Sequence, residues 1–302
     1  MLGFDTSRRS NIGIVATEAA NNILLHAQRG ELLICPGKTT EASWLDLIAL
    51  DSGPGIRDIG RAMEDGYSTI GTPGQGLGAI KRLSDVSSLY SVPGKGTAYW
   101  SRFETGALPL FSVVNIPVRG EAVPGDSYFI HRSGSRSVYM MVDGLGHGPG
   151  ATEAADAAVS STQKFLNCGS AEIIARSHEA MKKTRGAAMA VAIVDEERWT
   201  LTYAGVGNIS AMLASGSSYK SMASQNGTVG AILPRVVQEY VYPVGSNATL
   251  VMFSDGLTTK TNPTSYVGFQ NRHPMLLAGL LYRDFSRLRD DSTVMVAPLR
   301  GN

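Results

Sequence analysis

The sequence has little cysteine, because only Cys35 and Cys168 occur among its 302 residues. Two thiols without metal-ligand spacing build neither a disulfide framework nor a zinc cluster, and they fit a reducing compartment. No apolar run approaches the ~20 residues of a membrane span, and the first segment, MLGFDTSRRS, lacks the apolar core of a signal peptide. We therefore expect a cytoplasmic protein that does not enter a membrane.

Net charge is also almost absent, with 27 basic and 26 acidic side chains. This balance excludes the broad basic surface that nucleic-acid binding requires, so the expected partner is another protein. Hydrophobic residues make up 43% of the chain, enough for two cores, and domains usually hold about 100 to 200 residues. A break at ETGALP predicts a boundary between one domain at residues 1–106 and a second at 107–302.

The first half shows a helix and a strand that both lead into polar motifs. Helical spacing predicts a helix over residues 11–28, with an apolar face formed by Ile12, Val15, Ala19 and Ile23. The segment WLDLIAL predicts a buried strand that runs into Asp51, and LGAIKRLSDV predicts a second helix that begins at the glycines of GQGLG. Phosphates commonly bind where such loops meet helix starts.

Glu18 and Asn22 are four residues apart and therefore share one face of the predicted helix. Asn22 can give an oxygen to Mg²⁺, and Glu18 can accept the proton of an attacking hydroxyl. Asp51 can accept a hydrogen bond from the exocyclic amine of adenine. The motifs DSGPG and GQGLG permit tight turns and close approach to phosphates; the residues that we assign to nucleotide binding there are Gly53, Gly55, Gly74, Gly76, Leu77 and Gly78. Taken singly, each signal also fits a structural turn or a solvated helix face.

The order of these motifs resembles a known family. NIGIVATEAANNILLHA, DSGPGIRD, MEDGYSTIGTPGQGLGAIKRLSD and GKGTAYW are similar to the N box, the two glycine boxes and the closing strand of GHKL ATPases, especially RsbT-type serine kinases. The resemblance implies an α/β sandwich that binds ATP with Mg²⁺. It implies Glu18 as catalytic base, Asn22 as the Mg²⁺ ligand, Asp51 as the adenine-recognition residue and Thr97 as part of the nucleotide pocket.

The same resemblance implies an opening strand ahead of LGFDTSRRS, and this chain begins inside that segment. We therefore expect the sheet of the first domain either to lack its opening strand or to be completed by another chain, as in a homodimer.

Acidic residues recur at predicted strand ends or in loops of the second half: Asp126, Asp143, Asp255, and Asp290 or Asp291. Carboxylates gathered from distant strand ends repel one another unless a cation neutralises them. Two Mg²⁺ or Mn²⁺ ions can hold an activated water in line with a phosphorus atom, so that no nucleophilic side chain is needed. The sequence therefore predicts a dinuclear metal site for phosphate-ester hydrolysis.

VPGDSYF, VDGLGHG, TYAGVGNISAML, NGTVGAIL, FSDGLTTK and RDDSTVMV resemble the metal-dependent phosphatases of the SpoIIE and RsbX type, relatives of the PPM phosphatases. The resemblance implies a two-sheet β-sandwich flanked by helices, two of them at AADAAVSSTQKF and AEIIARSHEAMKKT. It implies that Asp126 and Asp143 bridge the metals, that the Gly144 carbonyl is a ligand, and that Asp255 and Asp290 complete one metal shell. The family motif favours Asp290 over Asp291.

His147 admits three interpretations: an acid for the leaving serine, a group that orients a ligand, or a loop packing residue. Arg185 and Arg235 can steer phosphate, or can be ordinary solvated charges. These three residues receive no assignment from the sequence.

Together the two resemblances imply a bifunctional enzyme, an ATP-dependent serine/threonine kinase joined to a metal-dependent phosphatase, acting on STAS-type proteins of a stressosome or anti-sigma pathway. Two alternatives stay open. The first half is a binding module for a sigma factor or STAS protein, or it is a nucleotide sensor for the phosphatase. The retained base Glu18 argues against pure binding, whereas the missing opening segment favours the sensor.

Overall fold

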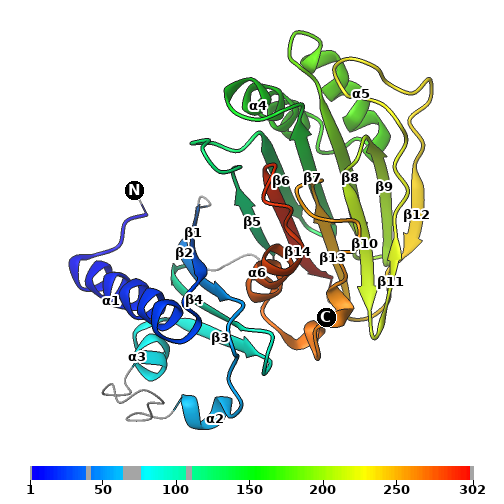
Figure 1. Cartoon of the computed structure of the whole chain (residues 1–302). Coiled ribbons are helices and arrows are strands. Elements are labelled where there is room, and N and C mark those ends of the chain that lie inside the picture. The colour runs from blue at the N-terminus through cyan, green and yellow to red at the C-terminus, as the bar shows by residue number, and fades with distance from the viewer. Residues whose placement is uncertain (1, 39–41, 64–75, 107–110, 300–302) are drawn as a thin grey trace. The chain divides into compact units, whose positions relative to one another are not determined.

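The computed structural model describes residues 2–38, 42–63, 76–106 and 111–299, and the chain divides into two compact units (Figure 1). The first unit comprises Met1–Leu110 with Met275–Arg283, and the second comprises Phe111–Pro274 with Asp284–Asn302. The predicted boundary after residue 106 adjoins a stretch outside the described residues and stays a prediction. Within the described ranges, every helix falls short of the length and apolar content of a membrane span.

The first unit is built on a four-stranded antiparallel sheet with helices packed against it. Its strands are β1 (Gly30–Lys38), β2 (Ser43–Asp51), β3 (Val86–Ser91) and β4 (Thr97–Thr105), in the order β1-β2-β4-β3. Its helices are α1 (Thr6–Asn22), the π-helical η1 (Ile23–Ala27), α2 (Ile59–Ala62) and α3 (Gly76–Leu83), together with most of α6 (Pro274–Phe285).

The predicted helices of this unit are present, with different ends. The first begins earlier than predicted, because the Asp5 side chain accepts a hydrogen bond from the Arg8 backbone N–H and caps α1. Its last turn is π-helical. Helix α3 is shorter than LGAIKRLSDV because the chain enters β3 at Val86.

Alternation along the central strands decides which side chains meet the helices. The core on the helix-covered face joins strand residues to α1, η1 and α3 and includes Val15, Ala19, Ile23, Leu47, Ala49, Ile80, Tyr99 and Phe103. On the opposite face of β2, Asp46 is fully buried and receives two hydrogen bonds from Arg102, at 2.7 and 2.8 Å. The ion pair with Arg102 compensates the buried charge of Asp46, which explains how the mainly apolar strand β2 accommodates a carboxylate.

The second unit consists of two five-stranded antiparallel sheets. One has the order β11-β10-β13-β14-β5 and the other the order β12-β9-β8-β7-β6. The strands are β5 (Ser112–Ile116), β6 (Asp126–Ser133), β7 (Arg136–Gly144), β8 (Ala187–Asp195), β9 (Thr200–Val206), β10 (Ser210–Ser215), β11 (Ser218–Ser221), β12 (Tyr240–Pro243), β13 (Ala248–Phe253) and β14 (Ser292–Leu299). Two 3₁₀ turns, η2 (Pro263–Ser265) and η3 (Phe269–Asn271), follow β13.

Two cores lie on opposite faces of β7, β8 and β9. One face packs against the other sheet, and the second face packs against α4 (Pro149–Lys164) and α5 (Ser170–Met181) (Figure 1). Strand β8 is therefore buried on both faces, which is why its sequence AAMAVAIV is a continuous apolar run. This unit is the two-sheet sandwich flanked by helices that the sequence predicts.

Candidate functional site

The predicted metal ligands gather at one end of the sandwich. Asp126 and Asp143 lie directly opposite each other in the β6–β7 register, and such pairs place their Cβ atoms about 5 Å apart on one face. Asp255 follows β13, and Asp290 precedes β14, the strand paired with β13. Asp143 is paired on its other side with Ala188, whose side chain belongs to the core between the sheets. The side chains of Asp126 and Asp143 therefore point between the two sheets.

Burial and mutual repulsion make this cluster costly to ionise without a cation. Desolvation, with repulsion from Asp126, Asp255 and Asp290, raises the pKa of Asp143 to about 9. Desolvation also raises the pKa of Asp126 to about 7, although the hydroxyls of Ser254 and Thr293 lower it.

Two further observations fit a divalent cation. The Asp126 Oδ2 atom is buried without a hydrogen-bond partner. Desolvation, followed by repulsion from Asp290, raises the pKa of Asp255. Across the described ranges, no group of three acidic, histidine or cysteine side chains is placed to hold a metal ion by itself. A Mg²⁺ ion at the Asp126–Asp143 pair would therefore complete its shell with waters, as Mg²⁺ commonly does.

We expect the metal-free protein to lose stability as the pH rises. The ordinary aspartate pKa is 3.8, and the folded values of about 7 and about 9 lie above it. At pH values between 3.8 and about 9, these two aspartates bind more protons in the folded state than in the unfolded state. The free energy of unfolding therefore falls with rising pH. Mn²⁺ should therefore raise the melting temperature more at about pH 9 than at about pH 5. Thermal melts in chelator and in Mn²⁺ test this; a metal-free melting temperature that climbs over this range would contradict it.

Asp290 and Asp291 have different environments. Asp291 is 2% exposed, and its two oxygens accept hydrogen bonds from the backbone N–H groups of Val118 and Gly125, both at 2.6 Å. Asp290 is only partly buried and accepts from the Asp291 N–H at 2.9 Å. The hydrogen-bonding capacity of Asp291 is directed to the backbone, and this supports Asp290 as the ligand.

The loop after β7 adds Gly144 and His147 to the site. Gly144 must lack a side chain, because a Cβ there would collide with the backbone of Ala151. His147 Nδ1 lies 2.6 Å from Glu121 Oε1. An ionised carboxylate can only accept, so the ring carries a proton on Nδ1 and Nε2 faces away from this bond. The contact orients His147, and its role in chemistry stays a prediction.

Asn208, which lies in the TYAGVGNISAML segment, donates from Nδ2 to Asp255 Oδ2 at 2.7 Å. The sequence reasoning missed the hydroxyls of Ser254 and Thr293, which act on Asp126. The first precedes the aspartate of SDGLTT and the second follows DDS, so both were within the recognised motifs.

In the first unit, Glu18, Asn22 and Gly76 meet. A Cβ at Gly76 would lie 3.3 Å from Glu18 Oε2 and 3.2 Å from Asn22 Oδ1, so both side chains face the N-terminus of α3. Leu77 and Gly78 belong to the first turn of that helix. The Asn22 Nδ2 atom is buried without a partner. A helix start beside a carboxylate and an amide suits a phosphate with its cation.

A second group forms around Asp51. Its Oδ1 atom accepts hydrogen bonds from the N–H groups of Gly53 at 2.8 Å and Thr97 at 3.2 Å. Among the described residues, none donates a hydrogen bond to the other oxygen, Oδ2, which leaves an acceptor for a ligand. Gly55 has φ +69° and lies against Val92, so only glycine suits that turn. Gly74 lies outside the described residues.

Comparison with known proteins relates the chain to two proteins of Bacillus subtilis. The chain is 46% identical to the serine/threonine-protein kinase RsbT of Bacillus subtilis over 96 residues, which is 32% of this chain and 72% of RsbT. The phosphoserine phosphatase RsbX of the same organism is 27% identical over 147 residues, 48% of this chain and 73% of RsbX.

The solved structure of RsbX in complex with magnesium has a TM-score of 0.56 at 17% identity, covering 88% of this chain and 99% of that chain, and it shows a shared fold. The family model of stage II sporulation protein E matches residues 133–299. Because that match spans more than half of the 302 residues, the chain belongs to the SpoIIE family.

Proposed function

We propose that this chain is a bifunctional regulator that phosphorylates serine or threonine on STAS-type proteins with its first unit and removes the phosphate with its second. The observation that carries the phosphatase half is the pairing of buried Asp126 with partly buried Asp143, where repulsion from Asp255 and Asp290 helps to raise the pKa of Asp143. Membership of the SpoIIE family supports a PPM-type serine/threonine phosphatase. ATP as the phosphate donor places the protein in the cytoplasm.

In the phosphatase unit, Asp126 and Asp143 would hold two divalent cations, with Asp255, Asp290 and the Gly144 carbonyl as further ligands. When bound, Mg²⁺ or Mn²⁺ supplies charge neutralisation and activation of a water nucleophile. The chain itself keeps these oxygens in place. The Asp126–Asp143 pair is set by strand register, Asn208 orients Asp255, and Asp291 ties the loop before β14 to the backbone of Val118 and Gly125.

In the first unit, we propose a GHKL-type ATP site. Asp51 Oδ2 would accept from the adenine amine, and Asn22 would provide an oxygen for Mg²⁺. The α3 N-terminus would bind phosphate oxygens, and Glu18 would take the proton of the substrate hydroxyl. The convergence of Glu18 and Asn22 on Gly76 supports this arrangement, as does the similarity to RsbT.

The proposed partners follow from the relatives. The chain is similar both to a serine/threonine-protein kinase and to a phosphoserine phosphatase. We infer that the two activities act in opposite directions on one class of small regulatory protein. The direct test is transfer of the γ-phosphate of ATP to a STAS protein, followed by its Mn²⁺-dependent release.

We expect Asp51→Asn to weaken Mg²⁺-ATP binding strongly. The substitution replaces an acceptor oxygen with an amide that cannot serve both backbone donors and adenine. Calorimetric titration of the full chain measures the change, and phosphatase turnover should stay near wild type because the ligands of that site are in the other unit. Unchanged ATP affinity would rule out Asp51 as the adenine-recognition residue.

A further inference from the structure

We propose that Arg185 anchors the phosphate group of the phosphoprotein substrate. This inference rests on the proposed phosphatase function and adds a substrate-binding residue to it. Arg185 is exposed and lies between α5 and β8. Its guanidinium lies where side chains would extend from two glycines that follow Asp143, Gly146 in the loop and Gly150 in the first turn of α4. A Cβ at Gly150 would lie 2.6 Å from Arg185 Nε, and one at Gly146 would lie 3.4 Å from Nη1.

Strand register places Arg185 at the metal end of the sandwich. Asp143 pairs with Ala188 and Gly144 pairs with Ala187. The pairing continues one step further, because the Leu145 N–H donates to the Gly186 carbonyl at 3.0 Å. Arg185 is the next residue, so the backbone brings it alongside the loop that begins at the proposed bridging ligand.

The Arg185 side chain has no counter-charge that would explain its position. Within the described ranges, no hydrogen bond or ion pair is formed by this guanidinium, whereas Arg136 and Arg132 in the same unit are each bonded to oxygen acceptors. An arginine presents a planar set of donors that matches two oxygens of a phosphate. An unpaired arginine beside the loop that follows Asp143 is thus suited to a phosphate monoester, the one substrate group that the site must hold.

The neighbouring helix start adds to the same site. Helix α4 runs over 16 residues from Pro149, and its N-cap, Gly148, has no side-chain hydrogen bond. The N–H groups of its first turn and the positive end of its dipole favour an anion there. Gly150 lies in that turn and touches the Arg185 guanidinium. Two independent features therefore favour negative charge at one place.

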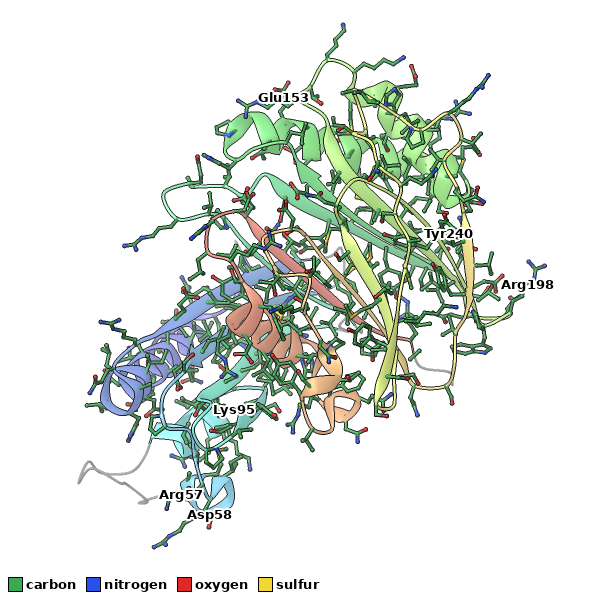
Figure 2. The ribbon with its side chains drawn as sticks, turned by 45° about the vertical axis from the view of Figure 1, so that its right-hand side comes forward. Arg57, Asp58, Lys95, Glu153, Arg198 and Tyr240 are labelled. Carbon is green, nitrogen blue, oxygen red and sulfur yellow. The ribbon has the colours of Figure 1, made fainter. Side chains whose placement is uncertain are left out.

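The test uses the full chain with Arg185→Gln, which keeps most of the stem, and Arg185→Lys, which keeps the charge. Arg198→Gln is the matched control, because Arg198 is also exposed but follows the opposite end of β8 from Arg185. Figure 2 shows Arg198 projecting from that end of the unit, away from Glu153 on α4. Two quantities are measured for each protein: kcat/KM for a phosphoserine protein, and the affinity of the Mn²⁺-loaded protein for inorganic phosphate by calorimetry.

Arg185→Gln should lower kcat/KM and phosphate affinity by roughly 10- to 100-fold, the range expected for losing hydrogen bonds to a charged group. Its Mn²⁺ half-saturation should stay at the wild-type value, Arg185→Lys should recover part of the loss, and Arg198→Gln should behave as wild type. Phosphate affinity unchanged in Arg185→Gln overturns the inference. So does a shift in Mn²⁺ requirement alone, because that outcome means that Arg185 only packs the loop.

The two readouts separate this inference from the proposed function. Absence of phosphoserine hydrolysis in the wild-type chain would reject the phosphatase proposal, and phosphate binding would still report on Arg185. If the wild-type chain hydrolyses phosphoserine and Arg185→Gln changes neither kcat/KM nor phosphate affinity, the proposed function stands. The role of Arg185 as the phosphate anchor is then rejected.

Discussion

Asp143→Asn and Asp255→Asn are each expected to abolish Mn²⁺-dependent hydrolysis of a phosphoserine protein and of p-nitrophenyl phosphate. Enzymes accelerate phosphate-monoester hydrolysis by up to ~10²¹-fold, so losing the groups that hold the cations should cost many powers of ten. Asparagine keeps the size of the side chain and removes its charge. Asp143 lies opposite Asp126 in the β6–β7 register. Desolvation, together with repulsion from the neighbouring aspartates, raises the pKa of Asp143.

These variants should still fold. Replacing a buried carboxylate by a neutral amide removes repulsion within the cluster, so circular dichroism and metal-free melting should resemble or exceed those of wild type. Asp156→Asn is the matched control, since Asp156 is exposed on α4, and it should retain full activity. Full hydrolysis by a folded Asp143→Asn protein would contradict the metal mechanism.

Asp290 and Asp291 extend this test to one adjacent pair. Asp290→Asn should lose hydrolysis with little change in melting temperature. Asp291→Asn should mainly lower the melting temperature. The two oxygens of Asp291 accept hydrogen bonds from the Val118 and Gly125 N–H groups in a buried position, and an amide can replace only one of these acceptors. Activity assays and thermal melts of both variants separate the roles, and the reverse pattern would make Asp291 the ligand.

Glu18→Gln is expected to abolish phosphate transfer from ATP to a STAS protein and to leave phosphatase turnover unchanged. The amide cannot accept the proton of the attacking hydroxyl, but it retains the shape of the side chain beside Asn22 and Gly76. ATP binding should remain close to wild type in calorimetry. Glu153→Gln, an exposed change on α4 of the other unit, should alter neither activity.

The outcome of the Glu18 test also decides between the alternatives for the first unit. Transfer by wild type that is lost in Glu18→Gln supports the kinase. No transfer by wild type, with ATP altering the rate of dephosphorylation, would favour a nucleotide sensor. No transfer and no effect of ATP on turnover, with tight binding of a STAS protein, would favour a binding module.

Local patterns in the sequence predict the elements that carry the sites. The segment WLDLIAL predicts the strand β2 up to Asp51. The ends of predicted strands point to Asp126, Asp143 and Asp255 as candidate site residues. What the sequence cannot show is pairing over distance. The backbone bonds from Val118 and Gly125 to Asp291 span 173 and 166 residues, and they distinguish the two adjacent aspartates in a way that composition and spacing do not.

Arg185 shows the same limit. In the sequence, nothing distinguishes Arg185 from the other arginines. The register of β7 with β8 brings it beside Gly146 and Gly150. The ends of the first helix could not be predicted from apolar periodicity. They depend on local hydrogen bonding, at the Asp5 cap and in the π-helical turn at Ile23–Ala27. The motifs therefore predict the residues of the candidate sites, and strand pairing identifies their neighbours.

The central claim is that one chain adds phosphate to a serine or threonine and removes it again with divalent cations. One experiment follows both steps: a STAS protein is incubated with the full chain and ATP labelled in its γ-phosphate, ATP is removed, and Mn²⁺ or excess chelator is added. The account predicts label on serine or threonine, lost with Mn²⁺ and retained in chelator. Absence of label with wild type, or its release in excess chelator, would contradict the account.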